Sequence, residues 1–164
     1  MKYIIRKATT SDLFTILEIV NHAILNTTSI YDYDVRTLED QTLIFETKNA
    51  KNFPLFVAVS NDEILGFGTY DTFRTKMGYR FTVEHSVYVK DGFAGKGIGK
   101  LLLEQLIATA KEENYHIMIG VIDASNENSI RFHEKFGFKS MGILKEVGFK
   151  FDRWLDANLM QLKL

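Results

Sequence analysis

The sequence predicts a mixed α/β (α+β) domain whose sheet is largely antiparallel. Runs of β-branched and aromatic residues alternate with runs of helical periodicity, which is typical of a sheet covered by helices. Two runs at 54–60 and 64–73 are separated only by the polar turn NDE, which indicates an antiparallel hairpin. Two further runs, at 138–151 and 153–164, end the chain as consecutive strands. We therefore expect a single domain, residues 1–164, with a twisted sheet of about seven strands and about four helices.

The first part of the chain contains one strand and two helices ahead of the hairpin. KYIIRKA, residues 2–8, is a short β-branched run, and Thr10 or Ser11 can cap the helix that follows it. Apolar residues recur at helical spacing in that helix, namely Leu13, Ile16, Leu17, Val20 and Ile24. Thr37 opens a second, weaker helix that extends to about Lys48.

The second part begins with a long central strand, YRFTVEHSVYV, at residues 79–89. A glycine-rich turn and a helix from about Gly97 to Asn114 follow, and HIMIGVI at 116–122 is a buried strand. A helix from Asn126 to Phe136 ends at Gly137, because glycine is the favoured residue just past a helix C-terminus.

The composition limits the classes of protein to which the chain can belong. It has 164 residues, of which 46% are hydrophobic and 25% charged, as in an ordinary globular domain. The formal net charge of −1 gives no general attraction to nucleic acid or to an anionic membrane. No apolar run is long enough to span a bilayer and no signal peptide is recognisable, so we expect a cytoplasmic protein. The absence of cysteine excludes disulfides, thiolate metal sites and a cysteine acyl-enzyme.

The stretch GFAGKGIGKLLLEQL, residues 92–106, places glycines between the central strand and a helix. It is not a Walker loop, because Leu101 follows Gly99-Lys100 and Ala94 occupies the position of the first glycine. Nor does the spacing of its glycines match the G-x-G-x-x-G of dinucleotide-binding folds. A helix N-terminus still offers free N–H groups and partial positive charge, so the loop is suited to an anion such as a pyrophosphate. The alternative is a tight strand-to-helix turn without a ligand.

Alternation along the central strand places Glu84 on one face, with Thr82, Ser86 and Tyr88. The opposite face carries Val83, His85, Val87 and Val89, is mostly apolar and is expected to face the core. A carboxylate in the middle of a sheet is costly unless it is paired or functional. Glu84 is therefore either the partner of Arg74 or Arg80 in a salt bridge, or a general base with a raised pKa.

A second group of polar residues lies on the helix that starts at Asn126. Asn126, Ser129 and His133 fall at i, i+3 and i+7, on one face of this helix. A lone helical histidine can be structural, but here it shares a stripe with an asparagine next to the end of a buried strand. His133 is a candidate functional residue on this evidence.

Together these motifs resemble the GNAT superfamily of acetyl-CoA-dependent N-acetyltransferases, and within it the phosphinothricin and methionine sulfoximine acetyltransferase branch. The glycine element indicates only the superfamily, whereas TVEHSVYV combined with HEKFGF and VGFKFDRWLD is more specific to the branch. The resemblance covers nearly the whole chain in the family's order. It is carried by NHAI at 21–24, RFTVEHSVYV at 80–89, GKGIGKLLLEQLI at 95–107, NENSIRFHEKFGF at 126–138 and EVGFKFDRWLDANLMQLKL at 146–164.

Two positions depart from the family's pattern. The family's loop usually begins with Gln or Arg, where this chain has Ala94. Asp152 stands where glycine is common, between the last two strands.

The resemblance implies that the central strand splays from its neighbour and that acetyl-CoA, the co-substrate, lies in the slot between them. Val87, Tyr88 and Val89 would bond the pantetheine arm through their backbone, and Asn126 would contact it from the other side. No metal is expected. The pyrophosphate would be cradled by Gly95, Lys96, Gly97, Ile98, Gly99 and Lys100.

The implied chemistry is direct acetyl transfer in a ternary complex. Glu84 is the candidate general base for the amine, directly or through a water molecule. The backbone N–H of Val87 is the candidate donor to the developing oxyanion. His133 is the candidate acid for the departing thiolate.

The branch acts on small amino acids and their analogues, so the substrate carboxylate needs a cationic partner. Arg74 and Arg80 are candidates, and Met77, Gly78 and Tyr79 between them are expected to line the pocket. The loop at 26–34 is a further candidate for the pocket lining. Lys150, Phe151 and Arg153 belong to the branch signature, and Arg153 could reach the site of a neighbouring subunit. The two arginines could alternatively be solvated surface residues.

Two other functions remain open. One is a GNAT enzyme for another amine, namely a polyamine, an aminoglycoside or a peptide N-terminus. The other is a CoA-binding module without catalysis. The branch also implies a homodimer, with the apolar strand ANLMQLKL at 157–164 as a candidate contact, and no nucleic-acid or membrane partner.

Overall fold

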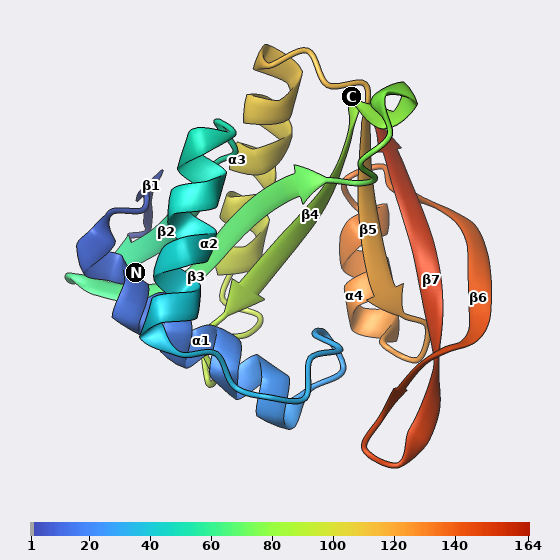
Figure 1. Ribbon diagram of the computed structural model, residues 1–164, viewed down its shortest axis with the longest axis horizontal. Helices are drawn as coiled ribbons and strands as arrows, with labels where there is room; N and C mark the ends of the chain where they lie inside the picture. Colours follow the sequence, from blue (N-terminus) through green and yellow to red (C-terminus); the bar gives the residue numbers. More distant parts are fainter. Residues whose placement is uncertain (1) are drawn as a thin grey trace.

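The computed structural model describes residues 2–164, which form one seven-stranded sheet flanked by helices (Figure 1). The sheet order is β1-β2-β3-β4-β5-β7-β6. The β4–β5 pair is parallel and the five other neighbouring pairs are antiparallel, which confirms the predicted fold class. The strands are β1 (Ile4–Lys7), β2 (Leu55–Ser60), β3 (Glu63–Thr72), β4 (Thr82–Val89), β5 (Ile117–Asp123), β6 (Lys139–Lys150) and β7 (Arg153–Lys163).

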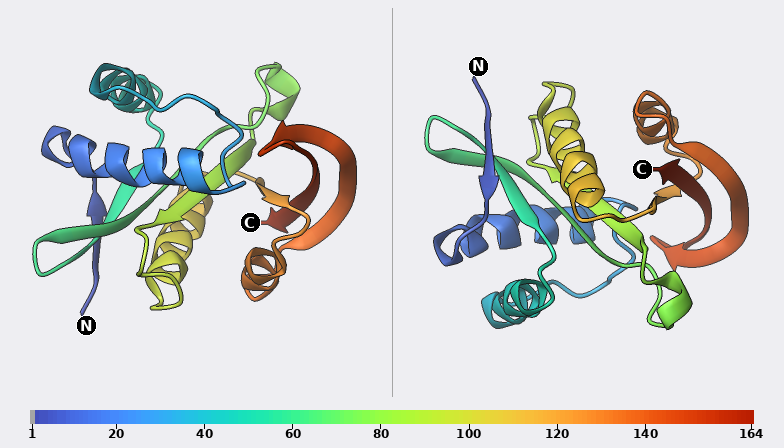
Figure 2. Two further views of the ribbon diagram at one scale, coloured as in Figure 1. Left: turned by 90° about the horizontal axis from the view of Figure 1, so that it is seen from below. Right: turned by 90° about the horizontal axis from the view of Figure 1, so that it is seen from above.

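Four α-helices cover the two faces of the sheet (Figure 2). In both views α1 and α2 lie on one face, and α3 and α4 lie on the other. None of the helices in the described part of the chain is long and apolar enough to cross a membrane. The helices are α1 (Leu13–Asn26), α2 (Leu38–Ala50), α3 (Ile98–Glu112) and α4 (Glu127–Glu134), with short 3₁₀ turns η1 (Thr10–Asp12) and η2 (Met77–Tyr79).

Each face of β4 packs into a separate core, as its alternation predicts. Val83 is fully buried with the apolar side of α3, where Leu102 and Leu106 are also inaccessible. Tyr88 packs instead against the core formed by α1 and the opposite sheet face, where its ring lies 5.1 Å from that of Phe67. Burying a large apolar side chain stabilises a fold by about 1.5–3 kcal/mol, so these two cores fix β4 between the helical layers.

Most predicted elements begin within two residues of their observed starts, and two begin later because a 3₁₀ turn comes first. β4 begins at Thr82 rather than residue 79, because Met77–Tyr79 forms the 3₁₀ turn η2. The N-cap of α1 is Asp12 rather than Thr10 or Ser11, because the 3₁₀ turn η1, which begins after Thr9, precedes the helix. The predicted cap of α2 is confirmed, since Thr37 accepts from the Asp40 N–H in a reciprocal capping box.

Asp12 joins the start of α1 to β1. Its carboxylate accepts hydrogen bonds from Arg6 Nη1 at 2.7 Å, from Arg6 Nη2 at 2.9 Å and from the Thr9 N–H at 2.7 Å. The bond from Arg6, followed by those from Thr9, lowers the pKa of Asp12 to about 2 against the cost of burial. The ionised form is therefore favoured in the folded state.

We expect Asp12→Asn to lower the free energy of unfolding by about 1–2 kcal/mol at pH 7, because the amide carries no charge for Arg6. The folded-state pKa lies below the unfolded one, so this contribution is present above about pH 4 and is lost as the pH falls toward 2. Urea unfolding at pH 7 and pH 3.5 measures the difference in free energy of unfolding between the wild type and Asp12→Asn, which should be smaller at pH 3.5. Asp34→Asn, at an exposed residue, is the control. An equal loss of unfolding free energy at both pH values would show that the charge of Asp12 does not stabilise the fold.

Candidate active site

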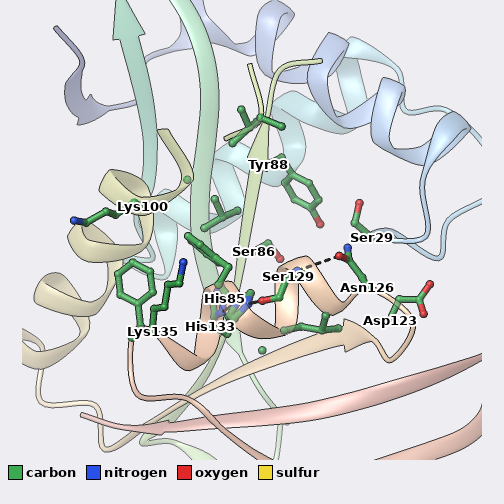
Figure 3. Close-up of a pocket in the computed structure, with 18 of the residues that line it drawn as sticks. Ser29, His85, Ser86, Tyr88, Lys100, Asp123, Asn126, Ser129, His133 and Lys135 are labelled. Atoms are coloured by element: carbon green, nitrogen blue, oxygen red, sulfur yellow. Dashed lines mark hydrogen bonds between the residues drawn. The ribbon is translucent and has the colours of Figure 1, made fainter. Parts of the chain in front are cut away.

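The strands β4 and β5 pair only at their beginnings. Their register runs from Thr82–Ile117 to Glu84–Ile119 and then stops, although both strands continue. A cavity of about 840 Å³ opens where they separate (Figure 3). It lies between the second half of β4, the glycine loop, β5 and α4, so the predicted splaying of the central strands is present.

The cavity brings together most of the residues predicted to bind a cofactor. Lys96 and Ile98 are not among its lining residues: the Lys96 ammonium lies 4.3 Å from the centre of the Phe93 ring, and Ile98, the first residue of α3, is buried in the core. Ala94 does line the cavity, so the departure from the family pattern lies at the site itself. The predicted residues that line it are Val87, Tyr88, Val89, Gly95, Gly97, Gly99, Lys100, Asn126 and His133.

The glycine loop has the geometry that an anion site at a helix N-terminus requires. Gly97 is the N-cap of α3 and has φ +86°, and Gly95 has φ +77°, both in the left-handed region that favours glycine. Leu101 donates the first helical hydrogen bond, at 3.2 Å, to the carbonyl of Gly97. The N–H groups that precede it at the start of α3 have no acceptor within the helix and can serve an anion.

A second helix N-terminus faces the same cavity. Asn126 caps α4, with its side-chain oxygen accepting from the Ser129 N–H at 3.0 Å. This bond uses the amide oxygen and leaves the side-chain NH₂ group of Asn126 as a donor (Figure 3).

Glu84 is half-buried on β4, at the point where the strands separate. Burial raises the pKa of its carboxyl group, while the positive charge of Arg74 acts in the opposite direction. The predicted alternative, a salt bridge with Arg74 or Arg80, is not formed among the described residues. Arg74 instead lies over the Phe73 ring at 5.1 Å, and Arg80 over the Phe81 ring at 4.5 Å.

A smaller cavity, of about 230 Å³, lies on the other side of Glu84 along β4. Thr82 and Val83 of β4 line it, and the larger cavity is lined by β4 residues from His85 onward. Glu84 lies between these residues along the strand and is not among the lining residues of either cavity. Only some of the residues predicted to bind the substrate line this smaller cavity. Arg74, Met77 and Arg80 line the smaller cavity together with Lys76, whereas Gly78 and Tyr79 do not line it.

His133 is buried against a second histidine that sequence reasoning had assigned only to the core. Its Nε2 lies 3.2 Å from Nε2 of His85, and its Nδ1 lies 2.7 Å from the Ser129 carbonyl oxygen. Burial lowers the pKa of both rings, that of His85 to about 3. Both rings line the larger cavity. The predicted alternation placed His85 on the buried face correctly, but contact with His133 depends on a helix 48 residues further along the chain.

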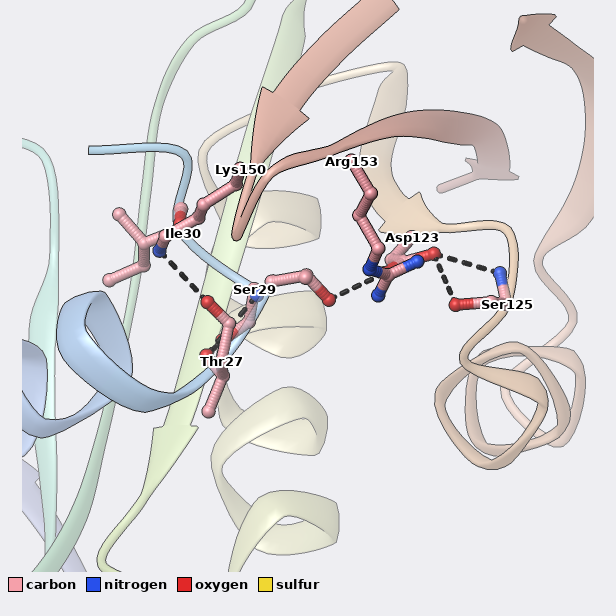
Figure 4. Close-up of polar contacts among 8 residues, drawn as sticks. Thr27, Ser29, Ile30, Asp123, Ser125, Lys150 and Arg153 are labelled. Carbon is pink, nitrogen blue, oxygen red and sulfur yellow. Dashed lines mark hydrogen bonds and ion pairs between the residues drawn. The ribbon is translucent and has the colours of Figure 1, made fainter. Parts of the chain in front are cut away.

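The loop after α1 meets the turn between β6 and β7 beside the larger cavity (Figure 4). The ammonium of Lys150 donates to the carbonyl of Thr27 at 2.8 Å and to that of Ile30 at 2.5 Å. Asp123, at the end of β5, accepts from Thr28 and lies 3.9 Å from the Arg153 guanidinium. Three segments that are distant in sequence thus form one wall.

The structure accounts for the unusual Asp152. Phe151 and Asp152 have φ +50° and +54° and form the two-residue connection between β6 and β7. Tight hairpins favour such a pair of left-handed residues, and aspartate tolerates this region better than most side chains other than glycine. The family's glycine and this chain's aspartate therefore meet the same backbone requirement.

Comparison with known proteins gives consistent matches over the whole fold. A family model described as "Acetyltransferase (GNAT) domain" matches residues 5–159. An L-methionine sulfoximine/L-methionine sulfone acetyltransferase of Pseudomonas aeruginosa is 42% identical over 161 residues, covering 98% of this chain and 94% of that protein.

Two solved structures share the complete fold. An N-acetyltransferase from Staphylococcus aureus Mu50 superposes with a TM-score of 0.98 at 45% identity, covering 99% of both chains. A phosphinothricin acetyltransferase from Sinorhizobium meliloti, solved in complex with AcCoA, gives a TM-score of 0.96 at 34% identity and covers 100% of this chain and 89% of that one.

We expect Gly97→Ala to destabilise the protein by about 1 kcal/mol, because a Cβ is disfavoured at φ +86°. Thermal and urea unfolding measure the effect. Gly78→Ala is the matched control, since Gly78 does not have a left-handed φ and a Cβ there would meet nothing within 4 Å. Equal stability of the two variants would show that the loop does not need the left-handed conformation.

Proposed function

We propose that this chain, which belongs to the acetyltransferase (GNAT) domain family, transfers the acetyl group of acetyl-CoA to the free amine of a small amino acid or analogue. The acceptor is of the methionine sulfoximine, methionine sulfone or phosphinothricin type. The observation that carries the proposal is the position of Glu84, a half-buried carboxylate without a bonded cation, on β4 between the residues that line a cofactor-sized slot and those that line a small cationic cavity.

The slot is suited to acetyl-CoA. After Glu84 the edge of β4 that faces β5 has no strand partner, so Val87, Tyr88 and Val89 can bond the pantetheine amides through their backbone. The N-terminus of α3 would receive the pyrophosphate, as anions bind at free helix N–H groups. Asn126 would donate its side-chain amide to the pantetheine from the opposite wall. The AcCoA complex of the Sinorhizobium meliloti relative supports this cofactor.

Glu84 would act as the general base. The amine nitrogen attacks the thioester carbon, the C–N bond forms, and the nitrogen loses a proton to the Glu84 carboxylate, directly or through a water molecule. The C–S bond then breaks and CoA departs as the thiolate. A buried carboxylate with a raised pKa is a stronger base than an exposed one, and a positioned base is worth about 10²–10⁴-fold in rate. The Val87 N–H would stabilise the oxyanion by roughly 3–4 kcal/mol.

The small cavity would hold the amino-acid part of the acceptor. Arg74 and Arg80 form no salt bridge within the described residues, and a guanidinium can bind a substrate carboxylate through two hydrogen bonds. The charge of Arg74 acts on Glu84, so a carboxylate held there would place its own amine near the base. The name of the Pseudomonas aeruginosa relative supports an acceptor of this size.

A homodimer is also proposed, through a different surface from the strand predicted at 157–164. That strand is β7, which is internal to the sheet and largely buried. A group of exposed apolar side chains lies on the edge strand β6 and at the start of β7, and an edge strand of this kind favours a partner. Six of them, between 43% and 62% exposed, are Met141, Ile143, Leu144, Val147, Phe149 and Trp154.

A cytoplasmic location stays a prediction from the sequence.

Glu84→Gln should lower kcat/KM by about 10²–10⁴-fold at neutral pH, since the amide cannot accept the amine proton. In the wild type the rate should rise with pH as Glu84 ionises, at a pKa above its usual 4.5, and the variant should lose this acid limb. Because burial favours the uncharged form, the glutamine should not lower the melting temperature at pH 7. Exposed Glu46→Gln is the control. Full activity of Glu84→Gln across the pH profile would exclude Glu84 as the general base.

Thiol release from acetyl-CoA tests the acceptor class, with methionine sulfoximine, methionine sulfone, phosphinothricin, the standard amino acids, spermidine and a lysine peptide as amines. We expect turnover only with small amino-acid acceptors, and Arg74→Gln should raise their KM about tenfold or more while leaving the KM for acetyl-CoA unchanged. Activity only on spermidine or the peptide would contradict the acceptor site. CoA binding without any turnover would favour a non-catalytic module.

A further inference from the structure

His85 has no part in the proposed reaction, although its ring lines the slot and contacts that of His133. It projects from β4 one residue after Glu84, is 7% exposed and is stacked on His133 from α4, with ring centroids 5.1 Å apart and planes inclined by 29°. Figure 3 shows the two rings together at one end of the cavity.

The hydrogen-bond partners determine where the protons of this pair lie. Nδ1 of His133 is 2.7 Å from the Ser129 carbonyl oxygen, which can only accept, so Nδ1 carries a hydrogen. Nδ1 of His85 is buried with no partner among the described residues, and a hydrogen there would be a buried donor without an acceptor. His85 therefore carries its hydrogen on Nε2 and donates it to Nε2 of His133 across 3.2 Å.

The surrounding residues leave the two rings little freedom. Phe138 meets both rings edge-on, at 5.4 Å from His85 and 5.2 Å from His133, and Phe132 packs against His133. The strand β5 passes at Gly120, where an added Cβ would lie 3.0 Å from Nε2 of His85. A side chain at this position would press on the atom that makes the contact.

We propose that His85 is a positioning residue for acetyl transfer. Its Nε2–H holds His133 as the neutral tautomer with the hydrogen on Nδ1, and it fixes the His133 ring as the wall of the slot beside the point where the strands separate. The inference rests on the proposed function, and it revises one role predicted from the sequence.

The revision concerns the proton for the departing sulfur. A neutral His133 whose Nδ1–H is bound to Ser129 and whose Nε2 accepts from His85 has no hydrogen directed at the slot. The acid role predicted for His133 is therefore replaced by a structural role at the thioester end. The proton that the amine gives to Glu84 is the one available to the thiolate, through Glu84 or solvent, so the reaction remains balanced.

The tautomers can be measured directly by long-range ¹H–¹⁵N NMR on the ¹⁵N-labelled full-length protein at pH 7. His22 and His116, both exposed, are assigned with His22→Gln and His116→Gln, and His85→Gln separates the signals of His85 from those of His133. We expect a protonated Nδ1 and bare Nε2 in His133, and the reverse in His85. A His133 with its hydrogen on Nε2, or on both nitrogens, would overturn the proposal. This measurement needs no substrate, so it is independent of whether the proposed function is correct.

The kinetic test compares two variants of His85 whose amide side chains differ in length. The glutamine amide of His85→Gln can replace the Nε2–H donor, whereas the shorter asparagine of His85→Asn cannot. We expect His85→Asn to lower kcat about tenfold or more with the KM for acetyl-CoA within about twofold, and His85→Gln to recover most of the loss. Equal kcat in the two variants would overturn the positioning role.

His116→Gln serves as the control for both variants, and melting temperatures show whether each variant is folded. If wild-type protein acetylates none of the amines tested, the proposed function fails while the NMR result still decides the tautomers. If wild-type protein is active and the two His85 variants behave alike, the proposed function stands and the inference fails.

Discussion

The separation of two parallel strands is the constraint on which the rest of the site depends. Parallel neighbours need a crossover connection, and here β4 and β5 are joined through α3, which begins just after β4 ends. The next helix, α4, begins just after β5 ends. Both helix N-termini therefore lie at the carboxyl ends of the separated strands, where α/β folds generally bind ligands. The same separation leaves one edge of β4 unpaired in the slot.

Where the strands separate, the surroundings of Glu84 allow a charged side chain, whereas those of His85 and His133 favour neutral ones. Glu84 is half-buried and near Arg74, so its charged form is costly but available, as a base requires. His85, one residue further along β4, and His133 of α4 are enclosed by Phe132, Phe138 and the backbone at Gly120, which favours neutral rings. In this arrangement Glu84 would accept the proton, and the uncharged histidine pair would only shape the slot.

Much of the architecture could be predicted because its signals are local. The hairpin turn and the helix start at Thr37 depend on neighbouring residues, and both are present as expected. Gly137 has the left-handed φ of +90° that is typical after a helix, but α4 ends at Glu134, two residues before the predicted Phe136. The N-cap of α1 could not be predicted in this way, because Arg6 on β1 holds the Asp12 carboxylate. The lining of the site was predictable where backbone position decides it, as at Val87 and Gly97.

Side-chain partners across the fold could not be read from the sequence. The contact of His85 with His133 joins β4 to α4, and the Lys150 contacts join the β6–β7 turn to the loop after α1. Arg74 and Arg80 were expected near Glu84, but their stacking on Phe73 and Phe81 in place of a salt bridge depends on the local packing before β4.

Amide hydrogen–deuterium exchange with and without acetyl-CoA would test the central claim most directly, since it reports which backbone groups become bonded. We expect slower exchange in peptides covering Val87–Val89 and residues 95–100 when acetyl-CoA is present, with little change at β1 and β2. Acetyl-CoA binding that protects other segments and leaves the second half of β4 unchanged would contradict it.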